Sequence, residues 1–228
     1  MSPPTPSAVW ALIPALNEEA SLPAVLDAVR AAGMRSLVVD DGSIDATGDL
    51  ATARADVCVR YGVRQGRGYA MALATGMNTL AGRSDVEWVV TLDADGQLAA
   101  ADAAALVAGA RQAGATVAIG VRGPKPTMPE QLASLLYSIT FGINDPFCGM
   151  KAFSIEVLRR HVGWAGRYVN LALPVRAVAV GEPLFQMPIS LHKRISGRST
   201  FAGLRIQARL LGAMVAALAM GLRGDGPR

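Results

Sequence analysis

The chain alternates short apolar runs with segments of helical periodicity throughout its first half. The apolar runs predict five strands, at 9–13, 36–39, 57–59, 87–92 and 116–121. The segments between them predict helices, at 17–32, from 45 onward, at 67–80 and at 101–113. Strands that alternate with helices of this length predict a mostly parallel sheet with helices on both faces. Ligands of such sheets bind outside the carboxyl ends of the strands.

The second half has a less regular pattern, which still continues the same α/β domain. It predicts a proline-containing loop at 122–129, a helix at 130–141, a turn at 144–149 and an extended run at 150–153. A short helix at 155–161, a late strand at 184–191 and a basic loop at 192–200 are predicted after these. We therefore expect one domain over residues 9–200, preceded by a flexible tail at 1–8.

The last segment, 201–222, is predicted to form an amphipathic helix. Its apolar stripe repeats at helical spacing, through Leu204, Ala208, Leu211, Val215, Leu218 and Leu222. The uninterrupted apolar part, 210–222, has 13 residues, whereas a helix that spans a membrane needs roughly 20. We expect this helix to pack on its own domain, to make a peripheral membrane contact, or to contact another subunit of an oligomer.

Composition and charge give only limited information about the partners and the cellular location of the protein. The net charge of +4 favours anionic partners such as phosphates or acidic lipid, and nothing beyond this charge points to nucleic acid. The first residues lack the basic and apolar regions of a secretory signal. The two cysteines make neither a disulfide framework nor a zinc motif. We therefore expect a cytoplasmic protein, which the last helix could bring to the inner face of the membrane.

A pair of carboxylates follows the apolar run that ends the fourth strand. Asp93 and Asp95 are two residues apart, and on an extended backbone this spacing puts both side chains on one face. Gly96 lets the backbone turn, and Gln97 offers a further carbonyl oxygen. Hard divalent ions such as Mg²⁺ and Mn²⁺ take oxygen ligands of this kind and bridge to substrate phosphates. An exposed turn is the simpler alternative for such a D-x-D motif taken alone.

Two more polar clusters follow the first and second strands. They are P-A-L-N-E-E at 14–19 and D-D-G-S at 40–43. Asn17 and Asp45 also suit helix N-caps, and Asp40 suits a hydrogen bond to the turn after its strand. Because the carboxyl ends of parallel strands share one edge, the three clusters together indicate a nucleotide pocket with a metal on the phosphates.

Four segments in this order carry a resemblance to a known family. P-A-L-N-E-E, V-V-D-D-G-S, G-R-G-Y-A-M-A-L-A-T-G and L-D-A-D-G-Q resemble the motifs of family-2 glycosyltransferases of GT-A fold. The polyprenyl-phosphate members, which are similar to dolichol-phosphate mannose synthase, match best. The resemblance covers roughly residues 8–200 and implies a Rossmann-like GT-A domain. Its nucleotide-binding half would be 9–121 and its acceptor half 122–200.

The resemblance also implies roles for individual residues of the first half. The residues expected to line the nucleotide site are Pro14, Asn17, Glu18, Asp41, Arg67 of the G-R-G turn, and Asp93. Within this set, Asp41 would contact the base or the ribose. The residues expected to hold Mg²⁺ or Mn²⁺ on the diphosphate are Asp93, Asp95 and Gln97.

In the second half, the resemblance places basic residues near the phosphates and the acceptor. Arg122 is similar to the family's arginine that faces the phosphates. The segment 145–151 resembles the acceptor-side motif D-x-x-S-G-[FL]-[RK], with Cys148 where serine is usual. The residues implied at the acceptor or its phosphate are Cys148, Lys151, Lys193, Arg194 and Ser199.

The reaction implied is transfer of a sugar from a nucleotide-sugar donor, with inversion at the anomeric carbon. Arg122 and Arg198 would neutralise charge on the leaving diphosphate. The acceptor would be a polyprenyl phosphate or another lipid or glycan. A phosphate acceptor needs no general base, because it is already largely dianionic at neutral pH. Asp145 is the candidate base, or a group that positions the acceptor.

Two alternatives stay open on the sequence. A sugar-phosphate nucleotidylyltransferase shares the α/β layout but needs a glycine-rich loop after the first strand, and residues 14–19 contain no glycine. A non-catalytic nucleotide-sugar-binding protein is the other alternative. The presence of Asp93, Asp95 and Arg198 argues against it.

Overall fold

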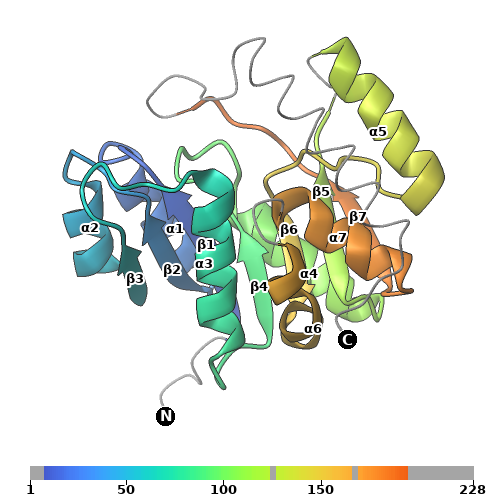
Figure 1. Ribbon diagram of the computed structural model, residues 1–228, viewed down its shortest axis with the longest axis horizontal. Coiled ribbons are helices and arrows are strands. Elements are labelled where there is room, and N and C mark those ends of the chain that lie inside the picture. The colour runs from blue at the N-terminus through green and yellow to red at the C-terminus, as the bar shows by residue number, and fades with distance from the viewer. Residues whose placement is uncertain (1–7, 124–126, 166–168, 195–228) are drawn as a thin grey trace.

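The computed structural model describes residues 8–123, 127–165 and 169–194, which form a layered α/β domain (Figure 1). The strands are β1 (Val9–Ala15), β2 (Arg35–Asp40), β3 (Val57–Arg60), β4 (Trp88–Thr91), β5 (Val117–Val121), β6 (Lys151–Ser154) and β7 (Leu184–Pro188). The helices are α1 (Leu22–Ala31), α2 (Thr47–Arg54), α3 (Tyr69–Ala81), α4 (Ala100–Gln112), α5 (Met128–Phe141), α6 (Ile155–Ala165) and α7 (Val169–Ala179). The tail predicted at 1–8, except its last residue, lies outside the described ranges, as do the helix predicted at 201–222 and both Arg198 and Ser199.

The strands form one sheet in the order β3-β2-β1-β4-β6-β5-β7. Every pairing is parallel except those of β6, which runs antiparallel to both β4 and β5. β1 is paired with β2 on one side and with β4 on the other, so the chain changes direction across the sheet at this point. Ligands of open α/β sheets bind at such a switch point, outside the carboxyl ends of the strands.

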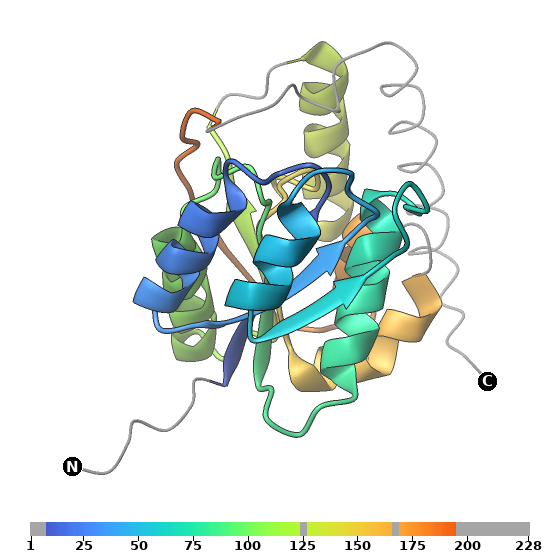
Figure 2. The ribbon, with the colours of Figure 1, turned by 90° about the vertical axis from the view of Figure 1, so that its left-hand side faces the viewer.

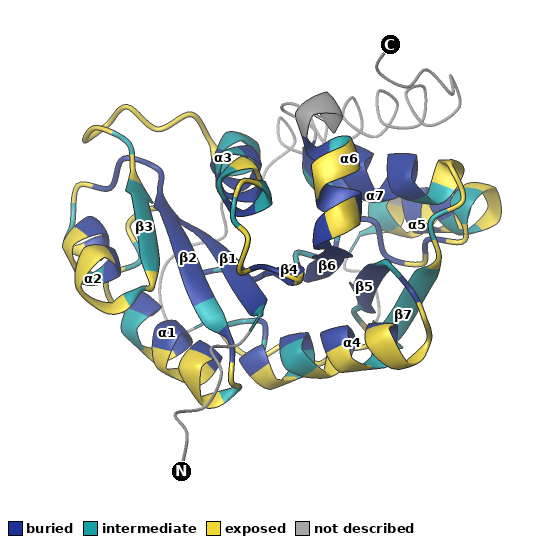
Figure 3. Ribbon diagram, turned by 90° about the horizontal axis from the view of Figure 1, so that it is seen from below, coloured by how far each residue is buried: buried dark blue, intermediate teal, exposed yellow. Residues whose placement is uncertain are grey.

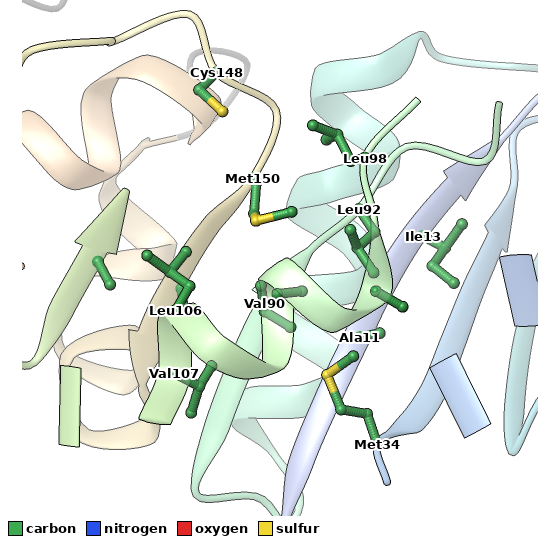
Figure 4. Packing of buried hydrophobic residues seen from close by; sticks show 14 of the residues in the cluster. Ala11, Ile13, Met34, Val90, Leu92, Leu98, Leu106, Val107, Cys148 and Met150 are labelled. Atoms are coloured by element: carbon green, nitrogen blue, oxygen red, sulfur yellow. The ribbon is translucent and has the colours of Figure 1, made fainter. Parts of the chain in front are cut away.

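The core consists of two apolar layers, one on each face of the sheet. All seven residues of β1 are buried. Ile13 belongs to the layer that includes Leu106 of α4, and Leu12 belongs to the layer that includes Leu73 of α3. Figure 3 shows α1 and α4 on one side of the sheet and α3, α6 and α7 on the other, and Figure 4 shows the layer around Ile13 and Leu106. A continuous apolar run is what a parallel strand needs when both of its faces are covered.

The predicted strands of the first half are confirmed, but β1 ends later and α1 begins later than predicted. The apolar run was expected to stop at Pro14, yet β1 continues to Ala15, and Pro14 is in register with Val39. Pro14 is tolerated there because the β1–β4 pairing ends at Leu12 opposite Thr91, so its missing N–H breaks no bond of that ladder. The helix expected from Asn17 begins only at Leu22. Figure 2 shows α1 packed beside α2.

The second half contains a helix that the pattern did not predict. α7 has a proline inside it, Pro174, which removes a backbone donor and disfavours a helical interpretation. The helix forms because Leu171, Leu173 and Val175 are buried, and their packing outweighs the lost hydrogen bond. Within the described ranges, no helix has both the length and the hydropathy needed to span a bilayer.

Candidate active site

The loop after β1 is fastened to the loop after β2 by hydrogen bonds. The Asn17 N–H donates to Ser43 Oγ at 3.0 Å, and the Ile44 N–H donates to Asn17 Oδ1 at 2.9 Å. The Glu18 N–H donates to Thr47 Oγ1 at 2.7 Å. Asn17 has a φ of 55°, a left-handed conformation that asparagine adopts more readily than most residues. Asn17 therefore joins two loops. The sequence predicted that it would cap α1, and this prediction is wrong, because Ser21 occupies the N-cap position.

Asp40 and Asp45 act within this same region. The Ser43 N–H donates to Asp40 Oδ1 at 3.0 Å, which confirms the local role expected for Asp40. The Thr47 N–H donates to Asp45 Oδ1 at 3.0 Å. Asp45 thus satisfies a backbone donor at the first residue of α2, although it lies one residue before the capping position. Both side chains therefore hold the backbone between β2 and α2.

Asp41 holds the G-R-G turn against the end of β2. Its carboxylate accepts the backbone N–H of Arg67 at 2.8 Å and that of Gly68 at 2.9 Å. A Cβ on Gly66 would clash with the Asp41 carbonyl oxygen, so only glycine allows this approach. The Asp41 carboxylate is buried, and ionised carboxylate oxygens accept more than one hydrogen bond each. Asp41 therefore brings the start of α3 to the same edge as the loops after β1 and β2.

The carboxylate pair after β4 lies beyond the end of the strand, where the chain enters a turn. β4 ends at Thr91, and residues 94–96 form a turn in which Gly96 has a φ of 76°. Asp93 accepts a hydrogen bond from the Tyr69 hydroxyl at 2.9 Å, and Asp95 accepts the Gln97 N–H at 2.9 Å. Burial and the neighbouring charge of Asp95 raise the pKa of Asp93 above its usual value. Two carboxylates in this setting favour a nearby cation.

Arg194 supplies one such cation from a distant part of the chain. Its Nη2 lies 2.8 Å from Asp95 Oδ2 and 3.3 Å from Gln97 Oε1. The backbone holds this segment in place, because the His192 N–H donates to the Gln97 carbonyl at 2.9 Å and Leu191 forms a β-bridge with Leu98. The sequence predicted Arg194 at a phosphate, and the structure places it on two of the three candidate metal ligands.

Arg122 and Asp145 form a bidentate ion pair. Arg122 Nε donates to Asp145 Oδ2 at 2.8 Å, Nη2 donates to Oδ1 at 2.9 Å, and the backbone N–H of Arg122 adds a third bond at 3.1 Å. Arg122 Nη2 also lies 3.6 Å from Glu130 of α5. Asp145 is fully buried. Its oxygens already accept three N–H groups, which suits a residue that positions Arg122 better than one that removes a proton.

Cys148 and Lys151 are both buried. Lys151 is 1% exposed, and its Nζ donates to the Cys148 carbonyl and to Asn170 Oδ1 of α7. Burial lowers the pKa of Lys151 to about 8 and raises the pKa of the Cys148 thiol to about 11. Both side chains were expected at an acceptor phosphate. In this arrangement they are enclosed, whereas Lys193 is exposed.

Two residues of the site were not predicted from the sequence. Tyr69 was interpreted only as part of the apolar stripe of its helix, yet its hydroxyl reaches Asp93. Gly149 lies so close to Asp93 that an added Cβ would be 2.6 Å from Oδ2. The only available signal was their position, directly after G-R-G and directly after Cys148. His161, which the sequence did not assign to the site, lies beside Glu182, away from these groups.

The chemistry of the donor set fits a hard divalent ion. Asp93, Asp95 and Gln97 offer two carboxylates and an amide oxygen, and burial together with the charge of Asp95 raises the pKa of Asp93. Among the described residues there is no cluster of three or more His, Cys, Asp or Glu side chains suited to a metal. An ion held by two carboxylates and one amide oxygen would keep sites for water and for substrate phosphate, as Mg²⁺ does in nucleotide sites.

Comparisons with known proteins point to one family. The profile described as Glycosyl transferase family 2 matches residues 10–136. An uncharacterized glycosyltransferase of Mycobacterium tuberculosis is 32% identical over 206 residues, covering 86% of this chain and 90% of that protein. The polyprenol monophosphomannose synthase of Mycolicibacterium smegmatis is 31% identical over 239 aligned positions, covering 93% and 86%.

A solved structure shares the fold at lower identity. Glucosyl-3-phosphoglycerate synthase from Mycobacterium tuberculosis, in complex with Mn²⁺, UDP and phosphoglyceric acid, superposes with a TM-score of 0.69 at 19% identity. The match covers 92% of this chain and 78% of that one. This likeness confirms the predicted GT-A arrangement of the sheet and its helices.

Proposed function

Because this chain belongs to glycosyl transferase family 2, we propose that it transfers a sugar, with inversion and with a divalent metal, from a nucleotide sugar to a polyprenyl phosphate. Family membership makes the chain a glycosyltransferase and favours this activity over nucleotidylyl transfer. The observation that carries the finer proposal is the convergence of the Asp93–Asp95 pair with the Asp41-supported loop at one edge of the sheet.

The donor nucleotide would lie across the loops after β1, β2 and β4. Asn17 and Glu18 fix the first loop, and Asp41 fixes the G-R-G turn with Arg67. The carboxylate of Asp41 retains acceptor capacity for a ribose hydroxyl or a base N–H. Pro14 is buried in β1 and supports the loop that follows it.

The diphosphate would be held by groups of both halves of the chain. Asp93, Asp95 and Gln97 would hold Mg²⁺ or Mn²⁺, which when bound neutralises charge on the leaving diphosphate. Arg122 would add a guanidinium whose direction is set by Asp145. Arg194 and the predicted Arg198 would complete the basic side of the pocket, together with Lys193 and Ser199.

The acceptor is proposed to be a lipid phosphate because a relative with this specificity in its name covers most of the chain. A phosphate monoester is itself the nucleophile, since its second pKa is about 6 and it is mostly dianionic at pH 7. The buried Asp145 is then free to act as a positioning group. Lys151 would contribute positive potential from beneath the acceptor side without touching the phosphate.

The test is a transfer assay with the purified chain. Radiolabelled nucleotide sugars, each with uracil or guanine as base, are incubated with Mn²⁺ and a short polyprenyl phosphate in detergent. We expect a polyprenyl phosphosugar whose anomeric configuration, measured by NMR, is opposite to that of the donor. Asp95→Asn should abolish transfer, and Asp27→Asn, an exposed carboxylate on α1, should not.

Each part of the proposal has its own contradicting result. Full transfer in excess EDTA would overturn the metal dependence. Retention of donor configuration would overturn inversion. Transfer to soluble glycans or phosphoglycerate, with polyprenyl phosphate ignored, would overturn the lipid acceptor.

A further inference from the structure

The segment that ends the described chain folds back onto the turn after β4. Leu191 pairs with Leu98, and the His192 N–H donates to the Gln97 carbonyl. These backbone contacts carry the Arg194 guanidinium to Asp95 and Gln97. The Asp95 side chain is only 8% exposed and that of Arg194 is 21% exposed, so this ion pair is partly shielded from solvent.

The guanidinium uses the oxygens that a metal would need. Asp95 Oδ2 and Gln97 Oε1 are two of the candidate metal ligands, and both lie within hydrogen-bond distance of Arg194 Nη2. A divalent ion on these oxygens would need the same lone pairs as the guanidinium, and the two positive charges would repel each other. The two cations therefore exclude each other. Asp93 differs, because it accepts a hydrogen bond from the neutral hydroxyl of Tyr69.

We propose that Arg194 is an internal counter-cation that competes with the divalent metal for Asp95 and Gln97, and that metal binding releases it to the donor diphosphate. This inference rests on the proposed metal site. Once it has left the carboxylate, the guanidinium can bind the diphosphate with the fork geometry that arginine offers to phosphate. Metal binding would thus be coupled to a change in the 190–194 segment, which is attached to the same turn.

The coupling predicts opposite effects of one substitution on two affinities. Arg194→Ala removes the competitor, so Mn²⁺ without nucleotide should bind about fivefold tighter or more, within the usual range of coupling between sites. The same variant loses a diphosphate contact. In saturating Mn²⁺, it should therefore bind UDP or GDP, whichever the wild type prefers, about fivefold more weakly or worse. A residue that merely stabilises the fold would not improve metal affinity.

The experiment measures Mn²⁺ binding to the full chain by the loss of the free-ion EPR signal, and then nucleoside diphosphate binding by calorimetry. Arg194→Met repeats the test with the apolar stem retained, in case Arg194→Ala is poorly folded. Arg111→Ala is the matched control, because Arg111 pairs with Glu87 at 2.8 Å beside the other end of β4 and its removal changes the net charge equally. This control should leave both affinities unchanged.

The outcomes separate this inference from the proposed function. Tighter Mn²⁺ binding together with weaker diphosphate binding, in both Arg194 variants and not in Arg111→Ala, supports the exchange. Unchanged or weaker Mn²⁺ binding in the Arg194 variants overturns the exchange but leaves the metal site standing. If the wild type binds no Mn²⁺ even with nucleotide, both the exchange and the metal-dependent function are overturned.

Discussion

At the scale of single residues, the charge of Asp93 is under opposing influences. Burial and the charge of Asp95 disfavour its ionised form, whereas the Tyr69 hydroxyl, Lys151 and Arg194 favour it. The balance raises the pKa of Asp93, so its charge is maintained at a cost that a bound cation would remove. The environment of Asp93 would therefore influence how strongly the proposed metal is held.

Tyr69→Phe should weaken Mn²⁺ binding. The hydrogen bond from Tyr69 lowers the pKa of the Asp93 carboxyl. The substitution keeps the ring but removes this hydrogen bond, so the ionised form of Asp93 that binds metal becomes less favourable. We expect a loss of roughly fivefold in Mn²⁺ affinity, measured by EPR at neutral pH. Tyr61→Phe is the control, because the Tyr61 hydroxyl pairs with Thr75 and not with a carboxylate. Equal affinities in both variants would contradict the role given to Tyr69.

Gly149→Ala should displace the Asp93 carboxylate. The new Cβ would lie 2.6 Å from Oδ2, closer than real contacts allow, so the carboxylate must move. We expect sugar transfer to fall at least tenfold, in line with roughly 1.4 kcal/mol or more of lost transition-state stabilisation. Gly82→Ala, where the nearest atom would be 3.6 Å away, should retain activity. Full activity of Gly149→Ala would show that the position of Asp93 is unimportant.

The polar residues after each strand could be predicted as site residues because side-chain chemistry and strand order are visible in the sequence. Tyr69 and Gly149 could not, because their importance lies in contacts with Asp93 that depend on three-dimensional packing. The Arg194 contact with Asp95 escaped prediction for the same reason. From sequence alone, a basic residue in a late loop is predicted to bind phosphate, because the carboxylate that it contacts in the folded protein cannot be identified.

At the scale of elements, the end of β5 is tied to the segment before β6 by the Arg122–Asp145 pair. Asp145 is fully buried and accepts both guanidinium and backbone donors. Asp145 precedes β6, which runs antiparallel between β4 and β5. The ion pair therefore fixes the position of the segment before β6 relative to the end of β5.

Asp145→Asn should destabilise the protein as well as reduce transfer. The substitution leaves a largely buried guanidinium without its full counter-charge, which costs on the order of 3 kcal/mol of unfolding free energy. Urea unfolding measures this loss, with Asp49→Asn, an exposed partner of Arg60, as the control expected to change stability by less than about 1 kcal/mol. An Asp145→Asn variant with unchanged stability and a lost limb in its pH–rate profile would indicate a general base instead.

Elements with strong periodicity were predicted well, and those that depend on tertiary packing were not. The first-half strands follow from their apolar runs, and α5 follows from a helical segment that Thr127 caps by accepting the Glu130 N–H. α7 was missed because Pro174 argues locally against a helix. The reversed direction of β6 also follows from how the chain packs, since an apolar run alone carries no direction.

At the scale of the whole molecule, the buried Lys151 links β6 to the end of β4 and to α7. Lys151 begins β6, and its backbone N–H donates to Thr91 Oγ1 at the end of β4. Its ammonium is enclosed between the Cys148 carbonyl and Asn170 of α7. Burial lowers its pKa from 10.5 to about 8. The stability of the whole fold should therefore depend on the protonation of this one group.

The free energy of unfolding should rise with pH above about 8 because of Lys151. Between pH 8 and 10.5 the folded state binds fewer protons at this group than the unfolded state does, so raising the pH favours folding. The full contribution is on the order of 3 kcal/mol. Urea unfolding at pH 7 to 10 should show the rise in the wild type relative to Lys151→Met, which lacks the titrating group. Parallel curves for the two proteins would contradict this assignment.

The measurement that tests the central claim most directly is a crystal structure of the full chain with Mn²⁺ and a nucleoside diphosphate, with the ion located by anomalous scattering. We predict an anomalous peak within coordination distance of Asp93 and Asp95 and of the diphosphate oxygens, with the Arg194 guanidinium moved from Asp95 to the diphosphate. A diphosphate bound elsewhere, or a peak absent from this carboxylate pair while nucleotide is present, would contradict the account.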